Sequence, residues 1–239
     1  MVIFKFVILI IIAYLIGAIP TGVIISRRFF GFDIRTQGSG NMGSTNVMRV
    51  LGTKWGVIVQ VLDILKGTIA VLLLANLIGN NWNIFAEIGI TLNIFKIIIG
   101  GTAVLGHIFS CFVGFKGGKG VNTTLGMLIA ILPIELISGV IAFVIIVGLS
   151  GFVSLGSMIG GAMLPLVLFL RYNLFKVNIS DYFTLIWVVL GIAVLLIVVH
   201  WKNIIKLFKG TENRMEKMRF IWNCWWKTKE KVNRDKIEK

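Results

Sequence analysis

Residues 121–150 read VNTTLGMLIAILPIELISGVIAFVIIVGLS, and how this run folds decides how many times the chain crosses a membrane. The run is apolar and 30 residues long, whereas one crossing helix needs about 20 residues. Pro133 and Glu135 stand in its middle. It can form either one long tilted helix or a hairpin of two short helices, and the choice depends on charges elsewhere in the chain.

The composition is that of an integral membrane protein. Hydrophobic residues make up 57% of the 239 residues, charged residues only 14%, and the mean hydropathy is +0.93. Soluble domains carry about 45–50% apolar and about 25% charged residues. The 24 basic and 10 acidic residues give a net charge of +14, which suits an anionic lipid surface or an anionic substrate. Nucleic acid is not an expected partner, because the basic residues flank apolar segments.

The cysteines argue against a cysteine metal site and a disulfide-rich fold, and the first apolar run argues against a cleaved signal peptide. Cys111 and Cys224 fit no metal-binding spacing and indicate no disulfide framework. The first run is longer than the core of a signal peptide and carries Pro20 and Gly22 instead of a small-x-small cleavage site, so we expect it to remain as a span. No metal cluster and no nucleotide site is evident, so neither a metal nor a cofactor is expected.

Five further segments are long and apolar enough to cross a hydrocarbon core, namely residues 3–25, 55–79, 84–109, 153–171 and 182–200. Cytoplasmic loops are rich in Lys and Arg. The connection 26–54 carries five basic residues, and the tail after His200 carries 12 against 5 acidic ones. These segments fall on one side only if the 121–150 run is a hairpin, whose short helices neighbouring protein must shield from lipid. The sequence therefore predicts an all-α bundle of seven transmembrane helices, with the N-terminus outside and the C-terminus in the cytoplasm.

The chain is expected to divide into a polytopic membrane domain, residues 1–208, and a basic tail, residues 209–239. Trp222, Trp225 and Trp226 stand among the basic residues of the tail. This pattern is typical of an amphipathic segment anchored at the membrane surface, and a substrate site is the weaker interpretation.

A glycine and lysine loop, Phe115-Lys116-Gly117-Gly118-Lys119-Gly120, interrupts the apolar sequence. Adjacent glycines let backbone N–H groups turn toward one point and the two lysines add positive charge, so the loop suits a phosphate or another anion. It is not a Walker A motif, because Gly120 stands where Ser or Thr should follow the lysine. The alternative interpretation is a positively charged turn at the membrane edge.

A second polar loop, Gly38-Ser39-Gly40-Asn41-Met42-Gly43, lies in the basic connection. It matches G-x-G-x-x-G only formally, because no buried strand precedes it and no βαβ unit surrounds it. With Thr45, Asn46 and Arg49 close behind, the loop is dense in hydrogen-bond donors and suggests a cradle for an oxyanion or a polyol. A polar loop with a helix cap is the alternative, which does not account for this concentration of polar residues.

Polar residues at the ends of other spans fall on the same predicted membrane face. His107 precedes the glycine and lysine loop, and Ser154 begins the sixth span. His200 and Asn203 follow the last span one helical turn apart, so they share a face. Clusters from four parts of the chain thus converge on one face, which favours a shared site.

Asp63 and Lys66 lie three residues apart inside the second span. A lone lysine near a bilayer centre costs about 2.5–3.5 kcal/mol on insertion scales. We therefore expect the two side chains to neutralise one another on one helix face. Their expected role is to pack or order the site, and direct contact with a substrate is the minor alternative.

Three motifs together resemble the bacterial PlsY family: GSGNMGSTN at 38–46, GH at 106–107 leading into FKGGKGV at 115–121, and HxxNIxKLxxGTE at 200–212. The shorter AIPTG at 18–22 and LDILKG at 62–67 are also similar to it, and the likeness runs from about residue 14 to residue 214. The resemblance implies a seven-span acyl-phosphate:glycerol-3-phosphate acyltransferase of the inner membrane with a cytoplasmic active site. Such enzymes make 1-acyl-glycerol-3-phosphate, which is lysophosphatidic acid, for phospholipid synthesis.

The implied chemistry needs no covalent intermediate, because an acyl phosphate is already activated. Positioning of a hydroxyl and stabilisation of developing charge are sufficient. The expected partners are the lipid bilayer and the two substrates, acyl phosphate and glycerol 3-phosphate, and a soluble enzyme that makes acyl phosphate is a candidate partner. The expected catalytic residues are Ser39, Asn41, Arg49, Lys119, His200 and Asn203, and the expected substrate-binding residues are Gly40, Thr45, Asn46, His107, Lys116, Gly117, Gly118, Gly120, Ser154 and Glu212.

Within this set, we expect Lys119 and Arg49 to bind phosphate groups, helped by Ser39 and by the amides of Gly117 and Gly118. His200 and Asn203 are expected to orient the attacking hydroxyl or to contact a phosphate. The chain departs from the family pattern where Ser44 and Asn122 replace a usual alanine, Lys206 an arginine, Ser110-Cys111 a Phe-Pro pair, and Ser150-Gly151-Phe152 a Thr/Ser-Arg-Tyr run.

Two other functions compete with acyl transfer. A membrane carrier for an organic phosphate predicts an inverted repeat and polar groups at the bilayer midplane, and neither is evident. A purely structural membrane anchor leaves the density of motifs unexplained.

Overall fold

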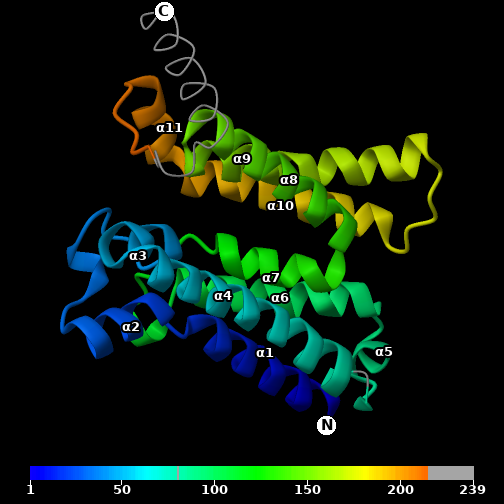
Figure 1. The fold of residues 1–239 in the computed structure, drawn as a ribbon. Coiled ribbons are helices and arrows are strands. Elements are labelled where there is room, and N and C mark those ends of the chain that lie inside the picture. The colour runs from blue at the N-terminus through cyan, green and yellow to red at the C-terminus, as the bar shows by residue number, and fades with distance from the viewer. Residues whose placement is uncertain (80, 215–239) are drawn as a thin grey trace, which may run out of the picture. The chain divides into compact units, whose positions relative to one another are not determined.

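The computed structural model describes residues 1–79 and 81–214, and every regular element in this part of the chain is a helix (Figure 1). The all-α prediction is therefore confirmed. The chain forms two compact units, Met1–Pro133 and Ile134–Lys239, and each is described by itself. Most of the predicted tail, including its three tryptophans, lies outside the described residues, so its anchoring at the membrane stays a prediction.

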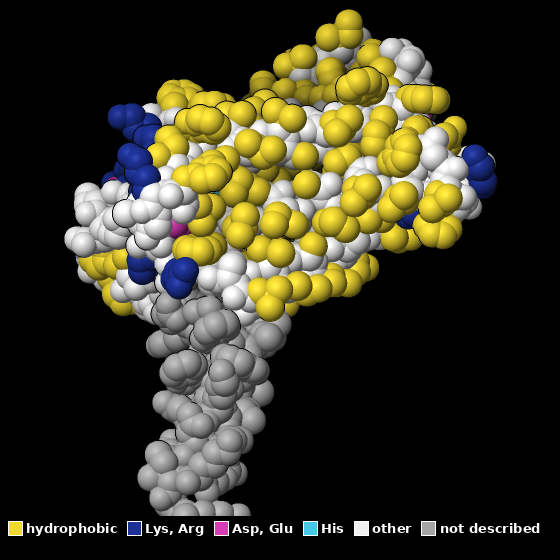
Figure 2. All heavy atoms as spheres, turned by 90° about the horizontal axis from the view of Figure 1, so that it is seen from above, with side chains coloured by type: hydrophobic (Ala, Val, Ile, Leu, Met, Phe, Trp, Pro, Cys, Tyr) yellow, Lys and Arg dark blue, Asp and Glu magenta, His cyan; other side chains and the backbone are white. Residues whose placement is uncertain are grey.

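Among the described residues, five helices are long and apolar enough to cross a membrane, and one bent pair of helices raises the number to six. Many of their apolar side chains are exposed, and on the face that Figure 2 shows hydrophobic side chains predominate while Lys and Arg gather toward the edges. This distribution is that of a multi-pass membrane protein. The count of seven crossing helices and their orientation stay predictions. The five helical segments are Thr53–Gly79, Leu92–Val113, Pro133–Ser150, Val153–Leu174 and Tyr182–Val199.

The 121–150 run forms two helices, α7 (Val121–Ile131) and α8 (Pro133–Ser150), separated at Leu132. Proline is favoured at the first position of a helix, where its missing N–H costs nothing, and it disfavours helical conformation in the residue before it. The prediction of two helices is confirmed. With 11 residues, α7 is shorter than a typical crossing helix.

The predicted span 3–25 is broken into α1 (Val2–Ala18) and α2 (Thr21–Phe30), which are bent by 43°. Pro20 causes the break, because it lacks an N–H and its ring clashes with the preceding helical turn. The predicted span is therefore a bent pair of helices, which together remain one candidate crossing.

The predicted span 84–109 is also two helices. The short α5 (Ile84–Ile88) ends at Gly89, whose φ of 77° is the left-handed conformation that glycine favours at a helix end. The crossing helix is α6 (Leu92–Ile108), which begins after Thr91, whose hydroxyl accepts a hydrogen bond from the Ile94 N–H at 3.3 Å.

Close backbone contacts hold the first unit together. In this unit α1 packs on α6, and α4 (Thr53–Ile69), which continues as η2 (Ala70–Gly79), packs on α7. A Cβ atom on Gly17 would lie 1.9 Å from the Ala103 carbonyl oxygen, and one on Gly126 would lie 2.0 Å from the Ile64 carbonyl oxygen. Small residues at these positions let the helix backbones approach, which is how helices associate within a membrane.

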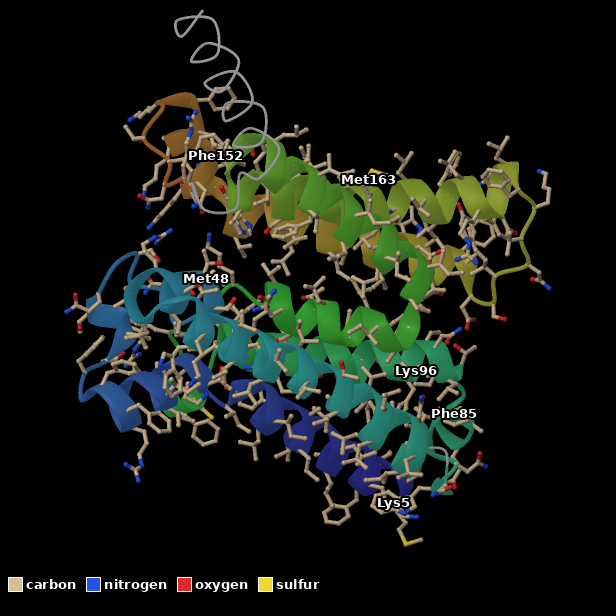
Figure 3. The ribbon with its side chains drawn as sticks, in the orientation of Figure 1. Lys5, Met48, Phe85, Lys96, Phe152 and Met163 are labelled. Carbon is tan, nitrogen blue, oxygen red and sulfur yellow. The ribbon has the colours of Figure 1, made fainter. Side chains whose placement is uncertain are left out.

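A small apolar core supports the polar loops at one end of the first unit. It lies under α3 (Ser44–Leu51) and under the loop before it, which includes the short helix η1 (Ile34–Thr36). Met48 marks this end in Figure 3, whereas Lys5, Phe85 and Lys96 lie at the opposite end of the unit. The buried members of the core are Val23, Ile25, Ile34, Met42, Val47 and Val59.

The second unit contains α8, α9 (Val153–Phe169), which continues as η4 (Leu170–Leu174), α10 (Tyr182–Val199) and α11 (Trp201–Phe208). α9 packs on α10. The buried carboxylate of Glu135, at the start of α8, pairs with Arg171 of η4. Pairing explains how the acidic residue inside the 121–150 run is accommodated in a membrane.

Candidate functional site

The buried side chain of Asn46 organises the 34–43 loop. Its Oδ1 atom accepts a hydrogen bond from the Ser39 N–H at 2.8 Å, and its Nδ2 atom donates to the carbonyls of Asn41 at 2.8 Å, Gln37 at 3.0 Å and Ile34 at 3.3 Å. All of these contacts are with backbone. Asn46 therefore holds the shape of the loop.

This fold of the loop leaves its small polar residues at the surface. Gly38 and Gly40 have φ of 60° and 73°, which is the left-handed region that favours glycine. The Asn41 Oδ1 atom accepts from the Gly43 N–H at 2.8 Å, so it tightens the turn before α3. Ser39 and Arg49 are exposed, and Asn41 and Thr45 are half-buried. These side chains therefore form the accessible part of the loop.

Arg35 connects this loop to the glycine and lysine loop. Its Nη1 atom donates to the Val113 carbonyl at 2.9 Å, in the short helix η3 (Cys111–Val113), and its Nη2 atom donates to Asp33 at 2.8 Å. These hydrogen bonds from Arg35 hold the pKa of the Asp33 carboxyl well below its usual range. A carboxyl with a lowered pKa contributes stability above its ordinary pKa of about 3.9 and loses it only as the pH falls below that value. The connection is therefore intact at neutral pH.

The amides of Gly117 and Gly118 do not serve as anion donors as the sequence predicted. The Gly117 N–H donates to the Ile108 carbonyl at 3.0 Å, and the Gly118 N–H donates to the His107 carbonyl at 3.1 Å. Because each N–H is already used, these two glycines cannot supply the expected phosphate contacts in this conformation. The prediction of amide donors is corrected.

The glycines are instead required by the close approach of the loop to His107. A Cβ atom on Gly117 would lie 1.9 Å from the His107 carbonyl oxygen, and one on Gly118 would lie 2.2 Å from its Nε2 atom. Gly120, with φ of 76°, then turns the chain into α7. Of the two lysines, Lys116 is exposed and Lys119 is half-buried.

A buried polar cluster lies next to this loop. The Lys66 Nζ atom is 2.9 Å from Asp63 Oδ1 and 2.8 Å from His107 Nδ1, and it donates to the Ile19 carbonyl at 3.0 Å. The Thr21 hydroxyl donates to Asp63 Oδ1 at 2.6 Å. The predicted pairing of Asp63 with Lys66 is confirmed. Since the ammonium group can only donate, His107 Nδ1 accepts and the ring proton lies on Nε2.

Two residues that depart from the family pattern contact each other. The Asn122 Nδ2 atom, in the first turn of α7, donates to the Ser44 hydroxyl at the start of α3 at 2.9 Å. This hydrogen bond is a second connection between the two polar loops.

In the second unit, Glu212 brings two predicted site residues together. Its Oε1 atom accepts from the Ser154 hydroxyl at 3.0 Å and from Asn203 Nδ2 at 2.8 Å. Ser154 and Asn203, which lie 58 and 9 residues before Glu212 in the sequence, therefore share one carboxylate oxygen.

His200 is buried between α10 and α11, and its Nδ1 atom lies 2.8 Å from the Leu196 carbonyl oxygen. A carbonyl can only accept, so Nδ1 carries the proton and the acceptor nitrogen of the neutral ring is Nε2. A backbone carbonyl thus orients the imidazole.

Phe152 lies at the same end of this unit as α11 (Figure 3). The guanidinium of Arg214 is 4.9 Å from the centre of its ring, within the range of a cation–π contact. The family resemblance implied an arginine within the 150–152 sequence, which this chain lacks. Arg214, from further along the chain, instead contacts Phe152. Among residues 1–79 and 81–214, no group of three or more His, Cys, Asp or Glu residues is placed to hold a metal ion.

Comparison with known proteins decides the family. The family model for glycerol-3-phosphate acyltransferase matches residues 7–210. The chain belongs to the glycerol-3-phosphate acyltransferase family. It is 41% identical over 227 residues to the glycerol-3-phosphate acyltransferase of Chlorobaculum parvum, which covers 88% of this chain and 96% of that one. It is 39% identical over 219 residues to that of Acholeplasma laidlawii, with 87% and 92% covered.

The fold of this acyltransferase is similar to that of PlsY (YgiH), an integral membrane glycerol 3-phosphate acyltransferase. The crystal structure of its glycerol 3-phosphate form gives a TM-score of 0.72 at 34% identity and covers 90% of this chain and 98% of that chain. Its lysophosphatidic acid form gives 0.71 at 32% identity, with 91% and 98% covered. The PlsY resemblance noted in the sequence is therefore confirmed.

The sequence did not indicate which residues hold the loops of the acyltransferase in place. Arg35 counted only as one of the five basic residues of the 26–54 connection, and Thr21 only as part of a short motif. Asp33 and the Leu196 carbonyl gave no signal. Each acts through a contact to a residue or backbone atom that only the fold brings close.

The buried cluster makes a prediction about stability. Lys66→Met removes the cation beside the buried Asp63 carboxylate, and an uncompensated buried charge costs about 3–5 kcal/mol. Asp63→Asn combined with Lys66→Met removes both charges, so we expect the double variant to be clearly more stable than Lys66→Met alone. Thermal unfolding in detergent micelles measures the difference, with Lys96→Met at the other end of the unit as the control. A double variant as unstable as the single one would contradict charge pairing as the main role.

Proposed function

We propose that this acyltransferase moves a fatty acyl group from acyl phosphate to the sn-1 hydroxyl of glycerol 3-phosphate. The hydroxyl oxygen attacks the acyl carbon, the bond between that carbon and the phosphate oxygen breaks, and 1-acyl-glycerol 3-phosphate and phosphate form. The observation that carries the proposal is the match to a PlsY structure in a glycerol 3-phosphate form, over 98% of that chain. The donor comes from the resemblance of the three motifs.

The residues of the first unit suit the binding of phosphate groups. Ser39 and Arg49 are accessible beside the loop that Asn46 holds, and Lys119 follows the glycines that contact His107. We assign phosphate binding to these three side chains, because fixed positive charges and donors stabilise the charge that develops on phosphate and carbonyl oxygens. Gly40, Asn41, Thr45, Lys116 and Gly120 line the same two loops, while Asn46, His107, Gly117 and Gly118 shape them.

The residues of the second unit suit the orientation of the attacking hydroxyl. Asn203 and Ser154 are fixed by Glu212, and His200 is fixed by the Leu196 carbonyl. Fixed side chains hold a reacting group in a productive position at little entropic cost. We assign hydroxyl orientation to His200 and Asn203, supported by Ser154 and Glu212.

The donor preference tests the reaction. Purified enzyme in detergent or nanodiscs should form 1-acyl-glycerol 3-phosphate from acyl phosphate and glycerol 3-phosphate, and acyl-CoA should be a poor or inactive donor. Lys119→Ala should weaken substrate binding and slow turnover together, whereas Lys96→Ala should not. Equal turnover with acyl-CoA would defeat the donor assignment, and transport of glycerol 3-phosphate by proteoliposomes without product would favour a carrier.

The proton of the attacking hydroxyl has two possible acceptors, His200 and the leaving phosphate. We assign it to the phosphate and keep His200 as a positioning residue. His200→Gln should then retain much of kcat, and the acid limb of the pH profile should survive the substitution. If His200 were the base, His200→Ala should lose roughly 10²–10⁴-fold in kcat and His200→Gln should be no better. A titration that disappears together with the rate in His200→Gln would show that the histidine takes the proton.

We propose that the enzyme lies in the inner membrane with residues 26–54, 110–120 and 200–239 on the cytoplasmic side. The excess of basic residues in these segments supports this orientation. In a background of Cys111→Ser and Cys224→Ser, an impermeant maleimide applied to intact cells should label Lys176→Cys but not Lys116→Cys or Lys209→Cys. Labelling at 209 would overturn the orientation.

A further inference from the structure

The exposed surface of α11 carries an apolar stripe. Trp201, Ile205 and Phe208 follow the i, i+4, i+7 spacing of one helix face, and their side chains are 60%, 40% and 90% exposed. Three large apolar side chains on a helix of eight residues are too many for a surface that only water covers.

A basic stripe runs beside the apolar one. Lys202, Lys206 and Lys209 follow the same spacing one residue later, which places them about 100° further around the helix. All three are exposed. The third side of the helix carries Asn203, which is hydrogen-bonded to Glu212, and α11 packs on α9 and α10 through the remaining surface. The helix thus has a protein face, an apolar face and a basic face.

The apolar stripe follows directly in the chain on the exposed apolar surface of α10. Val194 and Val198 of α10 are strongly exposed, and only His200 separates this crossing helix from Trp201. Because α10 ends where α11 begins, α11 starts at the surface of the bilayer. Tryptophan and lysine are the residues that helices place at this depth.

We propose that α11 lies in the interface of the bilayer, with Trp201, Ile205 and Phe208 among the acyl chains and its lysines bound to anionic lipid headgroups. Continuity with the surface of α10 identifies lipid as the occupant of the apolar stripe, and charge complementarity identifies anionic lipid. The consequence is that lipid contacts hold Asn203 and Glu212 at headgroup level. This inference goes beyond the proposed acyl transfer and does not depend on it.

Depth measurements on the full-length protein test the apolar part of this proposal. In a background of Cys111→Ser and Cys224→Ser, spin labels are attached at Phe208→Cys or at Lys202→Cys after reconstitution into vesicles. The label at 208 should collide more often with oxygen, which partitions into lipid, and the label at 202 more often with a water-soluble nickel chelate. Equal access of the chelate to both labels would place α11 in water. Protection of the label at 208 from both reagents would show that protein covers the stripe, and either result would overturn the proposal.

Lipid charge tests the basic part. The label at 208 should lie deeper in vesicles of phosphatidylcholine with phosphatidylglycerol than in phosphatidylcholine alone. Combining Lys202→Gln with Lys209→Gln should abolish most of this response, whereas Lys176→Gln, beyond the other end of α10, should leave it unchanged. A response that persists in the double variant, or that is absent from the unaltered chain, would overturn the binding of anionic headgroups. None of these readouts uses enzymatic activity, so failure here and failure of the proposed reaction are distinguishable.

Discussion

The arrangement of the first unit depends on the contacts that the ammonium group of Lys66 makes with the Ile19 carbonyl, Asp63 and His107. Pro20 breaks the first membrane helix, and a broken helix in lipid exposes carbonyl groups that no water can satisfy. The Ile19 carbonyl accepts from Lys66, and the Ala18 carbonyl accepts from Ser110. A lysine inside a membrane and a proline inside a helix are each unfavourable alone. Here the break at Pro20 leaves the Ile19 carbonyl free to accept from the Lys66 ammonium, and Asp63 supplies the counter-charge.

The same group connects this break to the glycine and lysine loop. Lys66 contacts His107, and the His107 carbonyl accepts the N–H of Gly118. The loop is therefore attached to the end of α6 by backbone hydrogen bonds, and glycines are needed because the loop passes too close to His107 for any side chain. Glycine-rich sequence here serves packing, and the positive charge of the loop comes from its lysines.

The polar residues of the first unit divide into those that hold the loops in shape and those that are exposed. Asn46 binds backbone groups, and Arg35 binds a backbone carbonyl and Asp33. The side chains of Ser39 and Arg49 remain accessible. A site for charged substrates needs both kinds, because donors stabilise developing charge well only when they are fixed in advance.

Sequence alone determined the class of fold and the resemblance to the family. Apolar length identified the membrane helices, and the charges of Asp63 and Lys66 indicated that they pair, because both signals are local. The division of the 121–150 run followed from the positions of the basic residues along the whole chain. Tertiary structure decided the rest: the use of the Gly117 and Gly118 amides, the link from Arg35 to Val113, and the orientation of His200 by a carbonyl. These contacts involve backbone atoms, which every residue carries alike. Only their position in the folded chain shows whether an N–H is available to a substrate or already bound.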